Sequence, residues 1–187
     1  MTDVVGLVLA AGSGTRFGGP KALARTPDGE PWVVRAVRLL QRGGADAVVV
    51  VLGAEADEAA ALVPEEAQVV VADRWHDGMG ASLAAGVAAL PEADSALITL
   101  VDLPELPDSV LDRVLDAGTD RDRIARAAYD GRPGHPVLLG RDHWAGFRDS
   151  LRGDEGGRIY LEEHDVEHVA APEAAAGGIV GGLYQPA

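Results

Sequence analysis

The sequence predicts an α/β protein of three layers, in which a mostly parallel sheet is covered by helices on both faces. Two observations carry this prediction. Several short runs, such as residues 4–10 and 47–52, are continuously apolar, as in strands buried on both faces of a parallel sheet. Amphipathic segments alternate with these runs, and such β–α alternation places parallel strands side by side with helices packed over them.

Each element is expected from its own local signals. Pro31 suits the first position of a helix over 32–42 that ends at a Gly-Gly pair. Ser82 and Asp108 are expected to cap two further helices, and Pro91 stops the first of them. The expected strands cover residues 4–10, 47–52, 68–71, 96–101, 124–128, 136–139 and 166–169; the other helices cover 54–62, 82–90, the segment after 108, 141–151 and 157–163.

Composition excludes several classes of function. The 187 residues carry 30 acidic and 16 basic side chains, for a net charge of −14, which argues against binding nucleic acid through a broad basic surface. There is no cysteine, so disulfides, cysteine-based zinc sites and thiol nucleophiles are excluded. No apolar run approaches the roughly 20 residues that span a bilayer, and no signal peptide is recognisable, so a cytoplasmic protein is expected.

The length of the chain and the composition of its C-terminal tail indicate the domain organisation. A chain of 187 residues is expected to form a single domain. Residues 170–182 are rich in Ala and Gly, and the tail 170–187 is expected to be poorly ordered.

Charge is unevenly distributed along the chain. Residues 1–50 carry six basic and four acidic side chains, a balance of +2, so the remaining residues carry −16. The chain's single lysine, Lys21, lies in this first segment. An anionic ligand is therefore expected to bind at one local cationic spot.

The glycine-rich segment after the first strand is the leading candidate for that spot. It reads Leu-Ala-Ala-Gly-Ser-Gly-Thr-Arg-Phe-Gly-Gly-Pro-Lys over 9–21, and glycine lets backbone N–H groups approach phosphate oxygens. The dinucleotide fingerprint fails because Phe17 stands where its third Gly belongs. The Walker motif fails because Lys21 follows a proline and precedes an alanine. What remains is a loop whose two cations, Arg16 and Lys21, can straddle a triphosphate.

The string over 9–21 resembles the signature of nucleotidyltransferases that activate a phosphorylated acceptor with a nucleoside triphosphate. Four further segments are similar to the molybdenum cofactor cytidylyltransferase branch: Gly78–Gly86, Val101–Pro104, Gly134–Leu138 and Gly153–Arg158. The resemblance covers residues 4–160 and implies a Rossmann-like nucleotidyltransferase fold. In the last segment Gly157 stands where that branch usually has Ala.

The resemblance also implies roles for individual residues. Arg16, Lys21 and Asp102 would be catalytic, and Asp102 would hold Mg²⁺, a cation that prefers carboxylate and phosphate oxygens. The nucleotide would contact Leu9, Ala10, Ala11, Gly12, Ser13, Gly14, Lys21, Asp73, Gly78 and Ser82. The acceptor would contact His135, expected on a loop facing the crevice, together with Asp154 and Arg158.

One departure from the family concerns the metal. Relatives supply a second acidic ligand from a late Asp-x-Asp-Thr-Pro-Glu-Asp string, whose counterpart here runs from His168 to Ala174 and keeps only the Pro-Glu pair. His168 is the replacement ligand that the sequence offers.

The resulting expectation is transfer of CMP from CTP to the phosphate of molybdopterin, with release of pyrophosphate and a molybdoenzyme as the recipient of the product. Three alternatives stay open: the same chemistry with GTP or with a sugar or alcohol phosphate, a non-catalytic nucleotide or cofactor carrier, and a nicotinamide-dependent oxidoreductase. The lost acidic string motivates the carrier, and the failed fingerprint disfavours the oxidoreductase.

Overall fold

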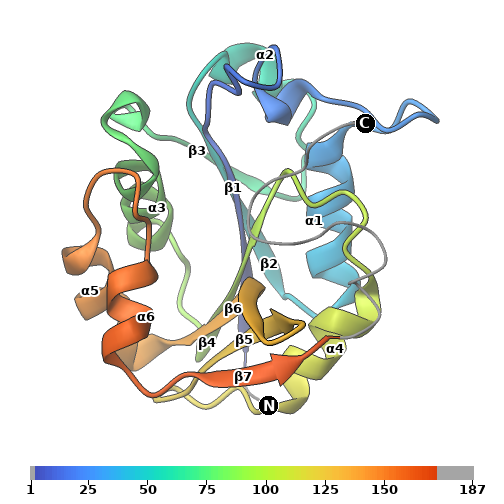
Figure 1. Cartoon of the computed structure of the whole chain (residues 1–187). Coiled ribbons are helices and arrows are strands. Elements are labelled where there is room, and N and C mark those ends of the chain that lie inside the picture. The colour runs from blue at the N-terminus through green and yellow to red at the C-terminus, as the bar shows by residue number, and fades with distance from the viewer. Residues whose placement is uncertain (1–2, 172–187) are drawn as a thin grey trace.

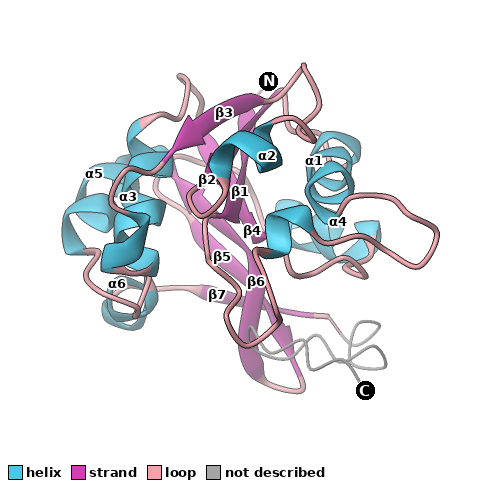
Figure 2. Ribbon diagram, turned by 90° about the horizontal axis from the view of Figure 1, so that it is seen from above, coloured by secondary structure: helices cyan, strands magenta, loops and turns pink. Residues whose placement is uncertain are grey.

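In the computed structural model, which describes residues 3–171, a twisted sheet forms the middle of three layers (Figures 1 and 2). Its strands lie in the order β3-β2-β1-β4-β6-β5-β7, and β6 alone among them runs antiparallel to its neighbours. The strands are β1 Val4–Ala10, β2 Ala47–Leu52, β3 Gln68–Val71, β4 Ser95–Leu100, β5 Ile124–Tyr129, β6 Arg132–Gly140 and β7 Glu167–Ala170. The predicted three-layer α/β fold with a mostly parallel sheet is confirmed.

The helices divide between the two faces of the sheet. Helices α1 and α4 lie on one side in Figure 1, and α3, α5 and α6 lie on the other. Their bounds are α1 Trp32–Arg42, α2 Ala56–Ala60, α3 Met79–Ala88, α4 Asp108–Asp116, α5 Arg141–Ser150 and α6 Arg158–Glu163, with short 3₁₀ turns η1 Lys21–Leu23 and η2 Trp75–Asp77. None of the helices among the described residues has the length and apolar composition to cross a bilayer.

Each face of the sheet carries its own apolar core. On the α1–α4 face Val8, Val37, Leu40 and Leu111 are fully buried, and α1 presents its predicted apolar stripe to this core. On the other face Leu7 and Leu83 pack together, and α3 approaches so closely that a Cβ at Gly86 would lie 2.5 Å from a Val51 methyl. This close contact holds α3 against β1 and β2.

Several local expectations are wrong. Ser82 does not cap α3; the helix begins at Met79, so Ser82 lies one turn inside it and is buried. Pro31 and Pro107 occupy the N-cap positions of α1 and α4, and Asp108 lies inside the first turn of α4, where it binds Arg42. The reason is the same for both prolines: each holds an extended conformation immediately before the helix.

The predicted single domain of 1–187 and poorly ordered tail extend past the described residues. Ala170 ends β7, and the Ala171 N–H donates to the Ala128 carbonyl, so these two residues belong to the sheet edge rather than to a loose tail. The remainder, 172–187, lies outside the described residues, as do Pro172 and Glu173 of the late string.

Candidate functional site

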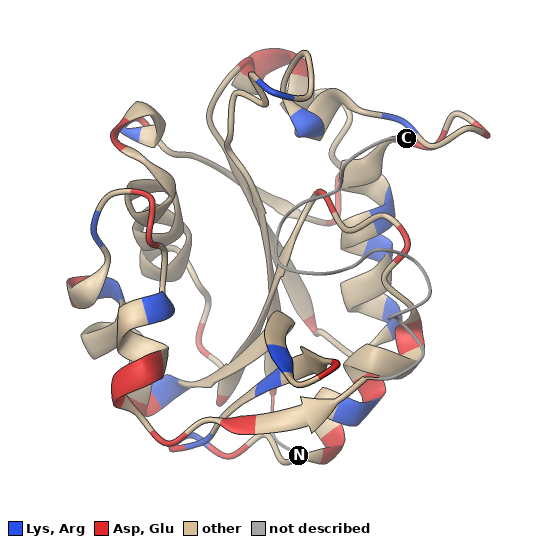
Figure 3. Cartoon of the chain, in the orientation of Figure 1, with Lys and Arg blue, Asp and Glu red and all other residues tan. Residues whose placement is uncertain are grey.

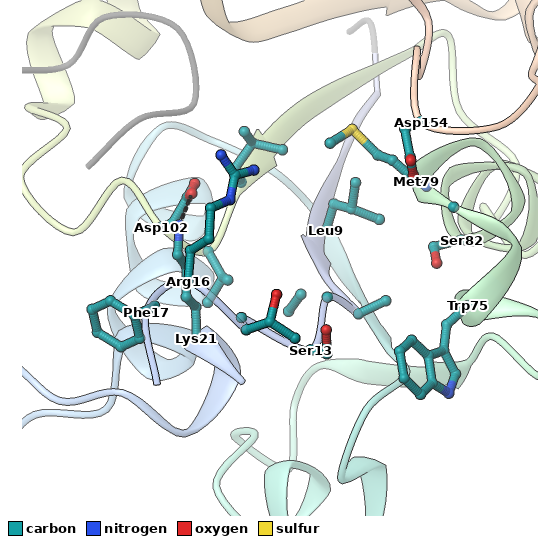
Figure 4. Close-up of a pocket in the computed structure, with 18 of the residues that line it drawn as sticks. Leu9, Ser13, Arg16, Phe17, Lys21, Trp75, Met79, Ser82, Asp102 and Asp154 are labelled. Atoms are coloured by element: carbon teal, nitrogen blue, oxygen red, sulfur yellow. Dashed lines mark hydrogen bonds and ion pairs between the residues drawn. The ribbon is translucent and has the colours of Figure 1, made fainter. Parts of the chain in front are cut away.

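A cleft of about 930 Å³ opens at the carboxyl ends of β1 and β4 (Figure 4). Ligands of open α/β sheets bind at this edge, because the loops that follow parallel strands meet there. The cleft is lined by Leu9, Ala10, Ala11, Gly12, Ser13, Gly14, Thr15, Arg16, Phe17, Lys21, Trp75, His76, Gly78, Met79, Ser82, Leu100, Val101, Asp102 and Asp154. Most of the predicted nucleotide-binding residues are thereby brought together.

The glycine-rich loop forms one wall of the cleft. The Gly14 carbonyl accepts N–H groups from Phe17, Gly18 and Gly19 at 2.8–3.1 Å, which curls the loop tightly. Gly14 has a φ of +59°, and a Cβ there would overlap the Gly19 carbonyl oxygen, so this turn requires glycine. Figure 4 shows Ser13 and Arg16 on the stretch of loop that borders the cleft.

An ion pair lies at the edge of this loop. The Lys21 ammonium donates to Oδ2 of Asp102 at 2.7 Å, and the two side chains are 23% and 13% exposed. Oδ1 of Asp102 is buried and has no hydrogen-bond partner among the described residues. Phe17 supports the lysine, with its ring 5.9 Å from the ammonium and 5.4 Å from the Trp32 ring. The pair thus joins a cation of the loop to a carboxylate with one unused oxygen.

The opposite wall is formed by η2 and α3. Trp75 is half-buried here because Gly53, at the end of β2, leaves room for it; a Cβ at Gly53 would lie 2.6 Å from Cβ of Trp75. Met79 is 45% exposed, and Ser82 faces the same space one turn further along the helix. This wall offers aromatic and thioether surface with one hydroxyl, which suits the base and ribose of a nucleotide better than its phosphates.

The N-terminus of α3 already has a protein ligand. Oδ1 of Asp154 accepts the Met79 N–H at 3.3 Å, and the Gly153 carbonyl accepts the Gly80 N–H at 2.8 Å. A carboxylate here satisfies the positive end of the helix, which disfavours a phosphate at this position. Asp154 reaches the cleft by this contact.

Four predicted residues do not line this cleft. Asp73 is exposed in the turn after β3, and Arg158 is held at the surface by Glu155 and Glu162. His135 lies inside β6, a strand that begins at Arg132 and is longer than predicted, so the expected loop position is wrong. His168 is exposed on β7, which β6 and β5 separate from the strand that carries Asp102.

Sequence reasoning missed four residues that line the cleft: Thr15, Phe17, Trp75 and His76. The available signal was position, because η2 follows β3 at the same edge of the sheet and Phe17 lies between the loop's two cations.

A divalent cation can be accommodated at Asp102. Its unpartnered Oδ1 is the hard oxygen ligand that Mg²⁺ or Mn²⁺ takes, but residues 3–171 contain no cluster of three or more His, Asp or Glu side chains able to hold an ion. A metal here would therefore complete its coordination with phosphate oxygens and water, as Mg²⁺ at nucleotide sites does. His168 lies three strand positions away, roughly 14 Å at the usual spacing between strands, so it is not a second ligand to an ion held by Asp102.

The cleft has basic and acidic side chains on different sides. Figure 3 shows acidic and basic residues interspersed over both helical layers. The cleft combines Arg16 and Lys21 with Asp102 and Asp154, so its cations lie on the loop side and Asp154 lies on the α3 side. This charge arrangement favours an extended anion along the loop over one along α3.

Comparisons with known proteins agree with this geometry. The family model of the MobA-like NTP transferase domain matches residues 6–169. The nicotine blue oxidoreductase of Paenarthrobacter nicotinovorans is 36% identical over 169 residues, which cover 86% of this chain and 82% of that protein.

Solved structures give the same architecture. Rv0371c of Mycobacterium tuberculosis H37Rv superposes with a TM-score of 0.77 at 27% identity, over 91% of this chain and 89% of that one, and a second structure of it is a complex with manganese. A nucleotidyl transferase from Methanothermobacter thermautotroptrophicus superposes with a TM-score of 0.73 at 23% identity, over 90% of this chain and 87% of that one, a likeness of fold alone.

Proposed function

The chain belongs to the MobA-like NTP transferase domain family, and from this membership we propose that it transfers CMP from CTP to the phosphate of molybdopterin, the organic part of the molybdenum cofactor. Pyrophosphate is the second product. The observation that supports nucleotidyl transfer most directly is the Lys21–Asp102 pair, which joins the glycine-rich loop to a carboxylate with an unused oxygen. The cytoplasmic location and delivery of the product to a molybdoenzyme are parts of the same proposal.

The reaction needs little acid–base chemistry from the protein. An anionic oxygen of the acceptor phosphate attacks the α-phosphorus of the nucleotide, and the bond from that phosphorus to the oxygen bridging the α- and β-phosphates breaks. The electron pair leaves with pyrophosphate, and no proton has to be moved. Catalysis then depends on positioning and charge stabilisation, which are what the cations of this cleft provide.

Each residue of the cleft has a task in this scheme. The loop N–H groups and Arg16 hold the triphosphate, and Lys21 leaves Asp102 to stabilise the charge that develops at the α-phosphate and on the leaving pyrophosphate. Asp102, freed from the ammonium, would hold a divalent cation. When bound, that cation supplies Lewis-acid stabilisation of phosphate charge. Trp75, Met79 and Ser82 receive the base and ribose.

A pyrophosphate-release assay tests this proposal. The intact protein is incubated with CTP, GTP, UTP or ATP, with Mg²⁺ or Mn²⁺, and with or without molybdopterin. Release that requires the acceptor and is fastest with CTP supports it. Release with GTP, or with a sugar or alcohol phosphate as acceptor, keeps the chemistry and replaces the substrate. Tight nucleotide binding without release indicates a carrier.

A second candidate comes from the relative with 36% identity, which is named an oxidoreductase. A nicotinamide dinucleotide also carries a pyrophosphate that Arg16 and Lys21 can hold, and Trp75 and Met79 offer surface for a planar ring. Binding of NADH or NADPH to the purified protein, followed by cofactor fluorescence, tests this candidate. Micromolar binding of either cofactor, combined with silence in the pyrophosphate assay, would replace nucleotidyl transfer by hydride transfer.

A further inference from the structure

Arg126, on β5, is a half-buried cation without a carboxylate partner. Its Nε and Nη2 donate to the Gly134 carbonyl at 3.2 and 3.1 Å, and no acidic side chain among residues 3–171 pairs with it. Burial lowers the pKa of its guanidinium, which records the cost of holding this charge away from water. Arg25 and Arg152 also bind only backbone carbonyls, but both are exposed. Carboxylates bind nine other arginines: Arg35, Arg38, Arg42, Arg74, Arg121, Arg123, Arg141, Arg148 and Arg158.

In a chain with almost twice as many acidic as basic side chains, this isolation is informative. A partly buried charge is retained when something compensates it, either a protein group or a ligand. A carbonyl oxygen accepts two of the five guanidinium N–H groups and carries no charge. The remaining donors of Arg126 are available to an anion.

His135, on β6, lies beside this guanidinium. The Gly134 carbonyl that Arg126 binds directly precedes His135, in the stretch of β6 where the β5–β6 register shifts between Arg126 and Ala128. Burial and the charge of Arg126 lower the pKa of His135 to about 4, so its imidazole is neutral at pH 7. Tyr129 binds the His135 backbone through its hydroxyl and leaves the ring free.

The backbone between these two residues is fixed. Gly134 packs on the Tyr129 ring so closely that a Cβ there would lie 2.5 Å from a ring carbon. That contact holds the Gly134 carbonyl, and the carbonyl in turn orients the Arg126 guanidinium toward the β5–β6 hairpin. The pair is thus set by strand register and packing rather than by a mobile loop.

Topology places this pair next to the cleft. β6 runs antiparallel to β4 with Val137 opposite Ile98, so His135 lies toward the carboxyl end of β4. Leu100 and Asp102 follow at that end and line the cleft. The glycine-rich loop comes from β1, on the other side of β4, so Asp102 lies between the loop and the Arg126–His135 pair along the edge of the sheet.

We infer that Arg126 and His135 form an anion-binding subsite that receives the phosphate of the acceptor. This inference rests on the proposed function, because it divides two anionic substrates between the two sides of β4. The triphosphate takes the loop with Arg16 and Lys21, and the acceptor phosphate binds Arg126 through guanidinium N–H groups and His135 through a ring N–H. The attacking oxygen then approaches the α-phosphorus from the side opposite the pyrophosphate.

The first test uses inorganic phosphate as the probe and no nucleotide. The pKa of His135 is measured from its ring C–H resonances over a pH series, with and without saturating phosphate, because a bound anion favours the imidazolium form. We expect phosphate to raise this pKa by at least about one unit. The response is expected to persist in Lys21→Met, where the loop is impaired, and to vanish in Arg126→Met. Arg123→Met is the matched control, because Arg123 belongs to the chain segment just before β5 and pairs with Glu167 at the surface.

The second test separates the two substrates kinetically. Arg126→Met is expected to raise the KM for the acceptor at least tenfold while leaving the KM for CTP unchanged, and Arg126→Lys is expected to recover part of the loss. An unmoved His135 pKa, or a phosphate response that survives in Arg126→Met, overturns the subsite. If no nucleotide releases pyrophosphate but the phosphate response is present, the proposed function fails and the anion site stands.

Discussion

Replacing Lys21 by methionine tests the role of the ion pair, because this change keeps the length of the side chain and removes its charge. The ammonium lies 2.7 Å from Oδ2 of Asp102. Two unit charges at this distance attract by about 1.5 kcal/mol in water and about 6 kcal/mol at an effective dielectric constant near 20. Desolvation of two partly exposed side chains offsets most of this attraction, so we expect unfolding free energy to fall by only about 1–2 kcal/mol. For a chain of this size that is a fall in Tm of roughly 2–8 °C.

Metal affinity is expected to change in the opposite direction. In the absence of nucleotide Lys21 occupies one oxygen of Asp102 and neutralises its charge, so the ammonium competes with a divalent cation. Lys21→Met should therefore tighten Mn²⁺ binding about tenfold, which corresponds to about 1.4 kcal/mol. Titration followed by the paramagnetic resonance of free Mn²⁺ measures this affinity directly.

Turnover is expected to fall although metal binding improves. Loss of a cation that stabilises transition-state charge costs about two to three orders of magnitude, so pyrophosphate release should drop at least about 100-fold. Arg25→Met is the control, since Arg25 is near the loop but binds only the Gly29 carbonyl and does not line the cleft. Weaker Mn²⁺ binding in Lys21→Met, or turnover equal to that of the unaltered protein, would refute this account of the pair.

Three further predictions concern stability. Gly14→Ala should lower the free energy of unfolding by at least about 2 kcal/mol, because Gly14 has a positive φ and a Cβ there would overlap the Gly19 carbonyl. Gly12→Ala is the control and should leave the melting temperature unchanged, because the space around Gly12 is open. An equal effect of both substitutions would contradict the loop geometry. His135→Asn should reduce the loss of stability between pH 6.5 and 4. The pKa of His135 is about 4 in the folded protein and 6.5 in the unfolded chain, so the unfolded chain takes up the proton first as the pH falls. The resulting loss of unfolding free energy, up to about 3 kcal/mol, is expected to be absent in the variant. Denaturant titrations at several pH values measure it, and parallel curves for both proteins would count against a buried neutral imidazole. Gly157→Ala should lower the free energy of unfolding by about 1–3 kcal/mol, because the new methyl group would overlap the buried Phe147 ring. Calorimetry that shows no change would mean that this ring is free to move.

Part of the candidate site could be predicted from the sequence because the residues of the proposed phosphate-binding loop are adjacent in the chain. The Gly-rich loop, Arg16 and Lys21 lie within thirteen consecutive residues, and the apolar run before them fixes their place at the carboxyl end of a buried strand. Asp102 was found for the same reason, since it directly follows another buried strand. Strands and their ends are predicted from short-range patterns, and these patterns were sufficient to predict most of the fold.

Expectations for residues whose position depends on distant contacts were less successful. Ser82 has the composition of a helix cap, but α3 begins one turn earlier, where Asp154 from a loop 75 residues away accepts the Met79 N–H. His135, flanked by Gly and Pro, reads as a loop residue. Pairing with β4 and β5 instead draws the whole segment from Arg132 to Gly140 into the sheet.

The sequence by itself determined the α/β class and predicted the glycine-rich loop, with the chain's single lysine, as the place for an anion, because apolar periodicity and glycine spacing act over a few residues. Only the tertiary structure decided that Lys21 pairs with Asp102, that Trp75 and Met79 share one wall of the cleft, and that no carboxylate of residues 3–171 pairs with Arg126. Charge pairing is a matter of distance in space. Strand order and register set those distances, so a list of acidic and basic residues cannot tell which cation is left for a ligand.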